Sequence, residues 1–501
     1  MSIDGIECSR DATGKCVPAE LGGIGRIEVV TRILTGTRPS LDDVFVTVSD
    51  DDVEIVVRFH PPFGDGIDGS CAPVTVNVED SLDDRWLQLA VRLECCFPCE
   101  RVLCHVFSLP GSLKAVRMLF RHVSTNRVCM EVSEGGRTIT VPALATDGIE
   151  DGVFYNPRQE RNRDVTIATL RAYRDREPAV ETYLDAMTAT GIRGLRAAAD
   201  GWSVTCCDRD PEAVTLCREN FQRHGLSGEV LERNVNALLH EGRFDVVDLD
   251  PFGSPMPFVD AALVGTRQLL CVTATDTAPL CGAHYRAGIR RYGVVSRPTE
   301  YHSEVGLRVL ISALCRAAAQ YDLAIRPLLS HVEGHSVRTY LELAHGAGAA
   351  DDAIDQLGTL WHCPECLYRE TENGLLTPAQ ATCPQCAGTN LLTAGPLWLG
   401  VTHDPSFVEG AIAHLDGTMN TERSSRRMLA ALAAELDEPT HYDQHVLCKR
   451  WNRAAGPIDA FLDAIREEGF EASRTHYGGT TFKTTADVRT IEQVTAQVND
   501  R

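Results

Sequence analysis

Lysine is nearly absent from this sequence. Four of the 48 basic residues are lysines (Lys15, Lys114, Lys449 and Lys483), while 70 acidic residues bring the formal net charge to -22. An acidic balance argues against a polyanionic partner, because nucleic-acid affinity comes largely from basic groups that displace counterions. However, an acidic, arginine-rich chain is also typical of adaptation to high salt, where molar salt screens surface charge over about 3 Å. An ordinary acidic enzyme is the alternative, so charge alone does not exclude nucleic acid.

Long apolar runs and a leader sequence are also missing. No stretch approaches the roughly 18 apolar residues of a membrane span. The first residues, MSIDGIECSRDATGK, carry acids where a secretory leader has basic residues and then an apolar run. We therefore expect a cytoplasmic protein without a membrane partner, and we infer no protein partner. The 19 cysteines of this 501-residue chain are expected to be reduced thiols or metal ligands.

The first 129 residues differ in character from the rest. Two stretches with alternating apolar residues, VFVTVSDDDVEIVVRF from Val44 and PVTVNVED from Pro73, predict strands there. Met130 then opens a short strand that resembles a fresh N-terminus. We predict that residues 1–129 are an accessory extension, or the product of a misassigned start.

Eight of the 19 cysteines lie in this first segment. The string CCFPCERVLCH brings four of them close together along the chain: Cys95, Cys96, Cys99 and Cys104. Because the second CxxC pair of a common zinc site is missing, unligated thiols are favoured over a metal site here.

Residues 130–348 are predicted to form a doubly wound, Rossmann-like α/β domain. From Tyr183 the pattern is strand, glycine turn, helix and strand, and further strands follow at FDVVDLD and LLCVTATD. Strands that alternate with helical segments predict a parallel sheet with helices on both faces. After the linker HGAGAADDA the composition changes, and residues 349–501 are predicted to form a C-terminal α+β domain with a cysteine-containing insert at about 360–390.

A glycine turn follows the first of these strands, in LDAMTATGIRGLRAAA. Asp185 ends the strand, and Gly191 and Gly194 flank a turn that opens a helix, which allows backbone to approach a ligand closely. Asp208 ends the next strand, where an acid is placed to bind ribose hydroxyls. Because a GxGxxG motif is missing, S-adenosylmethionine fits this turn better than a dinucleotide. A tight turn and a solvated strand end are the structural alternative.

A sharper motif follows the strand FDVVDLD at the carboxyl edge of the predicted sheet. There Asp250, Pro251, Phe252 and Gly253 combine an acid, a proline and an aromatic ring, as in amino methyltransferases. An exocyclic amine of a base has a delocalised lone pair, so it needs a carboxylate or carbonyl to accept its protons and a ring to hold the base by stacking. Asp250 could accept the proton, the carbonyl of Pro251 could orient the amine, and Phe252 could stack.

Several long strings, in this order, resemble the tRNA (guanine-26-N2)-dimethyltransferase family, in its archaeal, halophile-like form. They are FYNPRQERNRD from Phe154, DLDPFGSP from Asp248, VTATDTAPLCGAH from Val272, TEYHSEVGLR from Thr299, GPLWLG from Gly395 and SRTHY from Ser473. The resemblance covers residues 130 to about 485. It implies transfer of methyl groups from S-adenosylmethionine to N2 of guanosine 26 in tRNA, giving N2,N2-dimethylguanosine. An amino methyltransferase for another tRNA guanine or for adenine N6, and a catalytically silent RNA-binding relative, are the alternatives.

The resemblance also assigns site residues. Arg163, Arg193 and Asp208 match positions expected to hold S-adenosylmethionine, and Asp250 matches the catalytic acid. The family usually has Asp-Ala-Asn after the next strand, an acid near the adenine, and this sequence has Asn234, Val235 and Asn236 instead. Asn234 could still accept a hydrogen bond from the adenine amine, and Val235 could pack on the purine or simply in the core.

Four later cysteines have the spacing of a zinc site. Cys363, Cys366, Cys383 and Cys386 form C-x2-C-x16-C-x2-C, which fits a tetrahedral site with four thiolates. Four protein ligands leave no open position for catalysis, so we predict a structural Zn²⁺ in a zinc ribbon. His362 is a less favoured substitute ligand.

The C-terminal region also contains basic and aromatic residues that could contact tRNA, with KRWNR and SRTHY as the favoured clusters and solvated side chains as the alternative for each residue. The candidates are Arg423, Arg426, Arg427, Lys449, Arg450, Trp451, Arg453, Arg474, His476, Tyr477 and Lys483.

Overall fold

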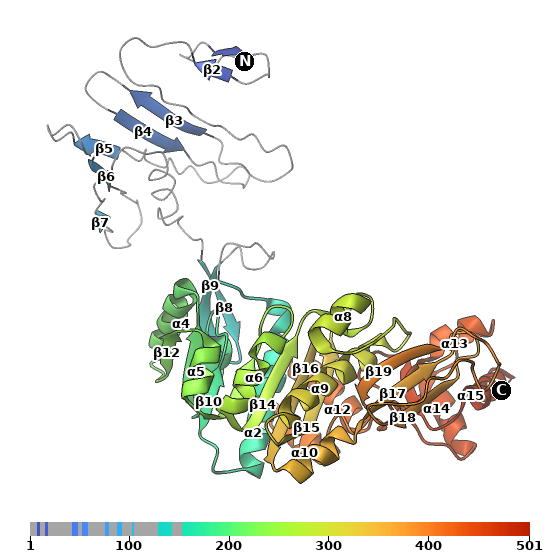
Figure 1. Cartoon of the computed structure of the whole chain (residues 1–501). Helices are drawn as coiled ribbons and strands as arrows, with labels where there is room; N and C mark the ends of the chain where they lie inside the picture. The colour runs from blue at the N-terminus through green and yellow to red at the C-terminus, as the bar shows by residue number, and fades with distance from the viewer. Residues whose placement is uncertain are drawn as a thin grey trace. The chain divides into compact units, whose positions relative to one another are not determined.

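The computed structural model divides the chain into two compact units, Met1–Thr125 and Asn126–Arg501 (Figure 1). In the first unit the structure describes seven short strands, and in the second it describes residues 129–142 and 153–500. The boundary between the units lies within five residues of Met130. The predicted roles of residues 1–129, 130–348 and 349–501 stay predictions.

The strands of the first unit pair locally in antiparallel fashion. Strands β3 and β4 pair, as do β1 and β2, and β5, β6 and β7 form a third sheet. Strands β3, β4 and β5 lie in the two stretches where alternation predicted strands, which confirms that prediction. The bounds are β1 Cys8–Arg10, β2 Cys16–Pro18, β3 Asp43–Val48, β4 Val53–Arg58, β5 Val76–Glu79, β6 Gln88–Arg92 and β7 Leu103–Cys104. The cluster Cys95, Cys96 and Cys99 lies outside the described residues.

A seven-stranded sheet forms the centre of the second unit, in the order β12-β11-β10-β13-β14-β16-β15. The first five strands are parallel, as the alternating pattern predicts. The predicted parallel sheet thus holds for these five strands but not for β16, which runs antiparallel to both β14 and β15, because β15 reaches it through a tight hairpin and not through a crossover helix. The bounds are β10 Thr182–Asp185, β11 Ser203–Asp208, β12 Glu229–Glu232, β13 Phe244–Leu249, β14 Thr266–Ala274, β15 Leu323–Glu333 and β16 Ser336–His345.

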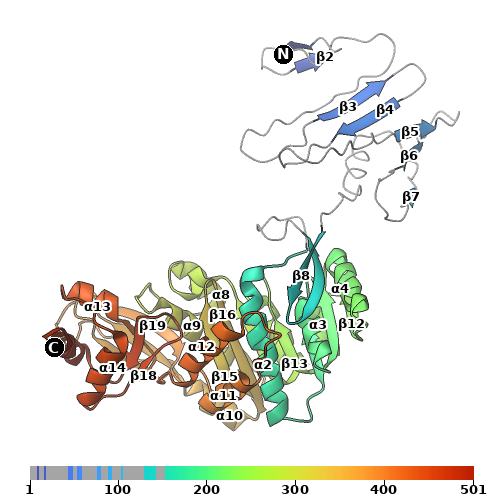
Figure 2. The same cartoon turned by 180° about the vertical axis from the view of Figure 1, so that it is seen from behind.

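Helices cover both faces of this sheet and bury two separate apolar clusters. One cluster packs α5, α6, α9 and α10 on the face seen in Figure 1. The other packs α2, α3 and α4, together with the later helices α11 and α12, on the face seen in Figure 2. The bounds are α2 Glu160–Arg176, α3 Ile192–Ala199, α4 Pro211–Arg223, α5 Val235–Glu241, α6 Met256–Gly265, α9 His302–Ala319, α10 Ala347–Ile354, α11 Pro405–Ala413 and α12 Glu422–Ala433.

A hairpin of β8 (Cys129–Glu134) and β9 (Arg137–Pro142) precedes the sheet. Its turn, Gly135–Gly136, has positive φ angles of 56° and 70°, which glycine adopts at low cost. The backbone amide of Thr140 donates to Asn220 at 2.9 Å, and Ile139 and Val141 are fully buried against the sheet layer. The hairpin is therefore an integral part of the second unit.

Two small antiparallel sheets follow, β18-β17-β19 and β20-β22-β21. The first shares its core with the large sheet, because Leu357, Leu360 and Leu397 belong to the same apolar cluster as α9. The second packs with α13, α14 and α15 around Phe461 and Phe482. The bounds are β17 Leu357–His362, β18 Arg369–Asn373, β19 Leu392–Trp398, β20 Tyr442–Asp443, β21 Ala472–Arg474, β22 Thr481–Thr484, α13 Gln444–Arg450, α14 Ile458–Glu467 and α15 Val488–Asp500.

The apolar core does not stop at residue 349, where composition places a domain boundary. Helices α11 and α12, from the later part of the chain, lie on α2 and complete one face of the large sheet. Among the described residues, no helix is both long and apolar enough to cross a bilayer.

Candidate active site and metal centre

Three acids mark the carboxyl edge of the parallel strands. Asp185 ends β10, Asp208 ends β11, and Asp250 follows the last residue of β13. Because β10 pairs with both β11 and β13, the three acids lie on neighbouring strands at one edge. This edge is where open α/β sheets bind ligands, and the sequence placed all three strand ends correctly.

The predicted glycine turn lies directly above β10. Gly191 is the N-cap of α3 with a φ of +79°, and a Cβ there would lie 2.5 Å from the Cys217 sulfur. The carboxylate of Asp185 accepts hydrogen bonds from the Gly194 amide at 2.9 Å and the Thr188 hydroxyl at 3.1 Å. Asp208 accepts from the Ala189 amide at 3.0 Å. The two carboxylates therefore hold this turn in place by accepting hydrogen bonds from Gly194, Thr188 and Ala189.

Burial shifts the protonation of Asp185. Desolvation raises the pKa of its carboxyl to about 7, with Arg193 opposing the shift and Asp248 adding to it. Asp185 is 2% exposed, so it is a structural acid of the turn.

Asp250 forms an ion pair with Arg193. The Nη2 of Arg193 donates to the Asp250 carboxylate at 2.5 Å, and its Nη1 donates to the Thr166 hydroxyl at 2.7 Å. Arg193 is buried, whereas 31% of the Asp250 side chain is exposed. One fixed cation therefore holds a carboxylate that remains open to solvent.

A second carboxylate, that of the buried Asp248, lies 3.7 Å from the Nε of Arg193 and so supports the Arg193–Asp250 pair. Arg338 donates to both Asp248 oxygens at 2.7 Å, and the Tyr183 hydroxyl donates at 2.9 Å. Burial would raise the pKa of Asp248, but Arg338 and Arg193 hold it below its usual range. Arg338 had no signal in the sequence, because it lies on the antiparallel strand β16, 90 residues from Asp248.

Arg163, a predicted cofactor residue, contacts the β8–β9 hairpin. Its Nε and Nη2 donate to the two oxygens of Glu134 at 2.7 and 2.6 Å. Arg196 donates to the same Glu134 at 2.9 Å and to Asp164 at 2.6 Å. Glu134 is fully buried, so it holds both arginines in place, a role that no sequence pattern indicated.

Two aromatic rings meet beside Asp250. Phe252 is 73% exposed and Phe154 is 36% exposed, and their ring centroids lie 4.5 Å apart in an edge-on arrangement. Pro251 is buried, and Gly253 bonds to Thr275 at the end of the next strand at 2.7 Å. Phe154 belongs to one of the family strings, but no sequence pattern assigned it to the site, because 97 residues separate it from Phe252.

Asn234 and Val235, the two predicted adenine contacts at the start of α5, have structural contacts. Asn234 caps α5, where its side-chain oxygen accepts from the amides of Asn236 at 2.9 Å and Ala237 at 3.4 Å. Val235 is 6% exposed and packs in the apolar cluster beneath α5 and α6. This is the core role that the sequence left open for Val235.

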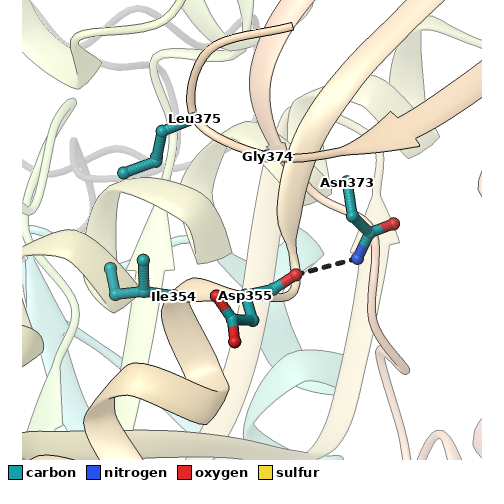
Figure 3. A pocket seen from close by; sticks show the side chains of 5 residues that line it. All are labelled: Ile354, Asp355, Asn373, Gly374 and Leu375. Carbon is teal, nitrogen blue, oxygen red and sulfur yellow. Dashed lines mark hydrogen bonds between the residues drawn. The ribbon is translucent and has the colours of Figure 1, made fainter.

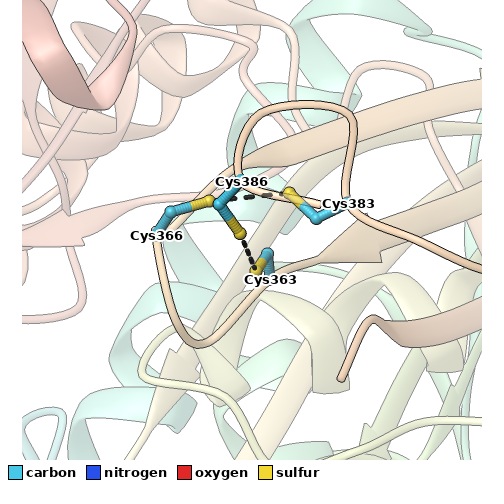
Figure 4. A group of neighbouring side chains, drawn as sticks. All are labelled: Cys363, Cys366, Cys383 and Cys386. Atoms are coloured by element: carbon cyan, nitrogen blue, oxygen red, sulfur yellow. Dashed lines mark hydrogen bonds between the residues drawn. The ribbon is translucent and has the colours of Figure 1, made fainter. Parts of the chain in front are cut away.

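The four predicted metal ligands converge in the small sheet (Figure 4). Cys363 and Cys366 follow β17, Cys383 and Cys386 precede β19, and all four sulfurs lie within 4.8 Å of one another. The Cys363–Cys386 and Cys366–Cys383 distances of 3.7 and 3.5 Å are close to the roughly 3.8 Å expected for four sulfurs at 2.3 Å from one tetrahedral ion.

Each CxxC pair lies in the same kind of turn. The Leu367 amide donates to the Cys363 carbonyl at 2.8 Å, and the Ala387 amide donates to the Cys383 carbonyl at 2.9 Å. Leu367 and Ala387 have φ angles of 64° and 57°. Two matching turns that aim sulfurs at one point fit a metal centre. His362 is not in this cluster, and its imidazole lies 3.6 Å from Glu300.

The aromatic residues of the favoured SRTHY cluster, His476 and Tyr477, and the later Lys483 make internal contacts. The Lys483 ammonium is buried between Glu304 at 3.0 Å and Glu435 at 2.9 Å, and His476 lies 2.8 Å from Glu435. Tyr477 stacks on His441 with centroids 4.8 Å apart. Lys483 is therefore not a surface cation, because two buried carboxylates require a partner.

The remaining candidates divide into paired and free cations. Arg474 pairs with Asp459, Arg426 with Glu422, and Arg450 donates to carbonyls of the first CxxC turn. Trp451 packs partly buried against the α13–α15 core. Four candidates are exposed and have no ion pair within the described residues: Arg423, Arg427, Lys449 and Arg453.

A surface pocket of about 380 Å³ lies elsewhere, between the end of α10 and the loop after β18 (Figure 3). It is lined by Ile354, Asp355, Asn373, Gly374 and Leu375, and none of the predicted catalytic or cofactor residues takes part. This pocket is therefore not part of the candidate site around Asp250.

Comparisons with family models and with known proteins all identify the same family. Residues 135–496 match the family described as N2,N2-dimethylguanosine tRNA methyltransferase. Two proteins named tRNA (guanine(26)-N(2))-dimethyltransferase, from Haloarcula marismortui and Halobacterium salinarum, are 55% and 52% identical over 367 residues. The alignments cover 73% and 72% of this chain and 100% and 99% of those proteins. The relatives confirm the halophile-like resemblance.

A solved structure is also similar. The complex of Trm1 from Pyrococcus horikoshii with S-adenosyl-L-methionine is 32% identical, with a TM-score of 0.65, and the match covers 73% of this chain and 99% of that chain. Because the family match spans well over half of the residues and the relatives are covered end to end, the chain belongs to the N2,N2-dimethylguanosine tRNA methyltransferase family.

Proposed function

We propose that this protein transfers methyl groups from S-adenosylmethionine to the exocyclic N2 of guanosine 26 in tRNA, giving N2,N2-dimethylguanosine. The observation that carries the proposal is the family match over residues 135–496, which includes the solvent-open carboxylate of Asp250 at the carboxyl edge of the sheet. Ligands bind at this edge of open α/β sheets, and an exposed carboxylate there can accept a proton from an amine during methyl transfer.

Asp250 would accept the protons of the amine. S-adenosylmethionine, when bound, supplies the electrophilic methyl group. As N2 gains a methyl group, it loses a proton, and Asp250, whose side chain is 31% exposed, would accept it. Each of the two N2 hydrogens would be replaced in turn by the same chemistry.

Arg193 would act as a positioning residue for Asp250. Its Nη1 and Nη2 atoms already donate to Thr166 and Asp250, and its Nε lies 3.7 Å from Asp248. Little hydrogen-bonding capacity remains for a cofactor. The resemblance assigns Arg193 to cofactor binding, and these contacts support a role in fixing the carboxylate instead.

Phe154 and Phe252 would hold the target base. A guanine must leave the RNA stack to reach Asp250, and an exposed ring replaces the stacking that it loses. Phe252 directly follows Pro251, whose carbonyl lies next to the acid in the chain, so one short segment provides the stacking ring and both acceptors. Phe154 would support Phe252 through their edge-on contact.

The cofactor would lie over the glycine turn. The groups present fit S-adenosylmethionine: a turn with a φ of +79° at Gly191 opens α3, and Asp208 is a partly exposed acid at the end of β11. Asp208 would bind the ribose.

The resemblance assigns the amino-acid part to Arg163, whose guanidinium also donates to Glu134 and to the Asn156 carbonyl. It assigns the adenine to Asn234 and to Val235, which is 6% exposed. Asn234 could contribute its amide group while its oxygen continues to cap α5.

The four cysteines would bind one structural Zn²⁺ in a zinc ribbon within a C-terminal α+β domain. Four sulfurs at tetrahedral spacing on two matching turns support this assignment. The ion would fasten the loops of β17–β18 and β18–β19 to each other, with no open position for substrate.

Mass spectrometry of nucleosides tests the activity. Transfer RNA lacking the modification would be incubated with the full chain and labelled S-adenosylmethionine, then digested. We expect labelled N2,N2-dimethylguanosine at position 26, and a transcript that carries adenosine in place of this guanosine should remain unlabelled. Label in N6-methyladenosine, or in guanosine at another position, would overturn the proposal.

A further inference from the structure

One segment next to the catalytic motif has no acids. Residues 277–299, TAPLCGAHYRAGIRRYGVVSRPT, contain four arginines and a histidine but no Asp or Glu. With 70 acids in 501 residues, a segment of this length would carry about three on average. The whole chain has a net charge of -22, whereas this segment is positively charged. A positively charged segment in an acidic protein favours binding of an anionic partner.

The segment is fastened to the loop that carries Asp250. It comprises α7 (Thr277–Leu280) and α8 (Tyr285–Tyr292), which follow the end of β14. Thr275 and Gly253 exchange two hydrogen bonds, at 2.7 and 2.9 Å. Tyr292, on the buried side of α8, donates to Asp276. Nine residues lie between Thr275, which is bonded to the loop of Asp250, and Tyr285, the first residue of α8.

Arg286 and Arg290 lie one turn apart on the exposed side of α8, with Ile289 between them at 40% exposure. Arg291 points elsewhere and pairs with Asp276 at 2.8 Å. In contrast, Arg286 and Arg290 have no carboxylate partner in the part of the chain that the structure describes. Two free cations on one face are available to phosphates.

Arg297 extends this surface beyond the helix. Its guanidinium lies over the ring of Tyr285, 4.0 Å from the centroid, and the residue is exposed. It has no ion pair among the described residues either. A guanidinium stacked on an aromatic ring is held in place while its N–H groups remain free for an acceptor.

Close backbone packing holds the segment rigid. A Cβ on Gly282 would lie 2.6 Å from the Arg297 backbone, and one on Gly288 would lie 2.9 Å from the Pro279 carbonyl. Val295 pairs with Gly395 through two backbone hydrogen bonds of 2.9 and 2.8 Å. Figures 1 and 2 both show α8 at the upper rim of the second unit. The arginines are thus presented from a fixed scaffold.

We propose that Arg286, Arg290 and Arg297, the α8 surface, bind backbone phosphates of the tRNA beside the target guanosine. The inference rests on the proposed function, because it takes tRNA as the substrate. A duplex or a flipped nucleotide next to Asp250 presents phosphates within one or two nucleotides, and fixed arginines there would set the register of the RNA. The acidic surface elsewhere would repel other placements.

Salt-dependent binding of full-length variants tests the proposal. Affinity for unmodified tRNA would be measured across a KCl series in which circular dichroism shows the protein to be folded. Each lost phosphate contact should lower the slope of log K against log salt by about 0.7 to 0.9, roughly a five- to eightfold loss of affinity at 0.1 M salt. We expect R286Q/R290Q to lose about twice that slope and to raise KM for tRNA, with kcat and cofactor affinity unchanged.

Arg243→Gln provides the matched control. Arg243 is exposed, has no ion pair among the described residues and lies just before β13, at the edge of the sheet opposite Asp250. This variant should bind tRNA like the original chain. Equal slopes for R286Q/R290Q and R243Q would overturn the α8 surface while leaving the proposed function intact. If the original chain fails to methylate tRNA at all, the proposed function itself fails.

Discussion

Two buried charge clusters in this protein share their chemistry and differ in one respect. The edge cluster comprises Arg193, Asp248, Asp250 and Arg338, and the inner cluster comprises Glu304, Glu435, His476 and Lys483. In the edge cluster one carboxylate side chain, that of Asp250, remains 31% exposed. In the inner cluster every side chain is at most 2% exposed. The same ion pairing therefore leaves an acid accessible to solvent where its side chain reaches the surface, and it holds buried elements together where every partner is buried.

Function and stability should separate along this division. Removing a charge from the edge cluster should affect catalysis, since Asp250 faces solvent and is the proposed proton acceptor. Removing one from the inner cluster should affect folding, because it leaves a charge buried without a partner. Substitutions in the two clusters therefore test this division directly.

Asp250→Ala, with the largest expected effect, should abolish methyl transfer while cofactor affinity stays within a few fold. In the proposed function the carboxylate acts on the amine and not on the cofactor, and a positioned base contributes about 10²-fold or more. Single-turnover kinetics and a cofactor titration would measure both quantities. Turnover above about a tenth of the original would contradict this role.

Arg193→Gln sharpens the same point. If Arg193 positions Asp250, kcat should fall and the affinity for cofactor should change little. If cofactor affinity falls first, the resemblance-based assignment of Arg193 to cofactor binding is the better one.

Loss of the metal should disorder the two loops that carry the four cysteines and leave the large sheet intact. Metal analysis of freshly purified protein should give one zinc per chain, and replacement of Cys363 and Cys383 by serine should remove it. The variant should still bind S-adenosylmethionine. Cys448→Ala, which removes a buried thiol outside the cluster, should retain the metal, and protein without zinc from the start would refute the assignment.

Lys483→Met should lower the free energy of unfolding by about 3 kcal/mol or more, the usual cost of breaking a buried pair. Glu435 would lose its ammonium partner, and Glu304 would retain Arg308 as its cation. Denaturant unfolding measures this. Lys449→Met, at an exposed lysine, should leave stability unchanged. A Lys483 variant with full stability but weak tRNA binding would restore the surface role that the sequence suggested.

Buried groups next to the two clusters should respond to pH in opposite directions: His403 and His441 lie near the inner cluster, and Asp185 lies near the edge cluster. Burial lowers the pKa of His403 and of His441 to about 4, so the unfolded state binds more protons between pH 4 and 6.5 and stability falls on acidification. At the edge, burial raises the pKa of Asp185 to about 7, so the native state binds the extra proton between pH 4 and 7 and stability rises on acidification.

Because the histidines outnumber the acid, net stability should fall from pH 6.5 to 4.5, with each group contributing up to about 1.4 kcal/mol per pH unit. Unfolding at the two pH values would show a steeper dependence for Asp185→Asn and a shallower one for His441→Phe. An unchanged dependence in both variants would contradict these assignments.

The smallest effect should come from removal of the first segment. The family match begins at residue 135, and Glu134, which holds Arg163 and Arg196, lies after Met130. A chain that begins at Met130 should therefore fold, bind cofactor and methylate tRNA like the full chain. An insoluble or inactive truncated protein would show that residues 1–129 are an integral domain.

Local patterns in the sequence determined much of the site. The strand ends at Asp185 and Asp208, the acid-proline-aromatic motif at Asp250 and the two CxxC turns all lie where the sequence predicted. Each depends on neighbours within a few residues: a strand that stops, a turn that needs glycine, or a pair of thiols on one turn. Short-range geometry is encoded in short-range sequence.

The tertiary structure decided what depends on residues far apart in the chain. Phe154 meets Phe252, Arg193 meets Asp250, and strand β16 turns antiparallel to bring Arg338 to Asp248. It also decided which cations remain free, burying Lys483 while leaving Lys449 exposed. Whether a charge is buried depends on which elements pack over it, and that packing buries apolar surface from the whole unit, which no local pattern records.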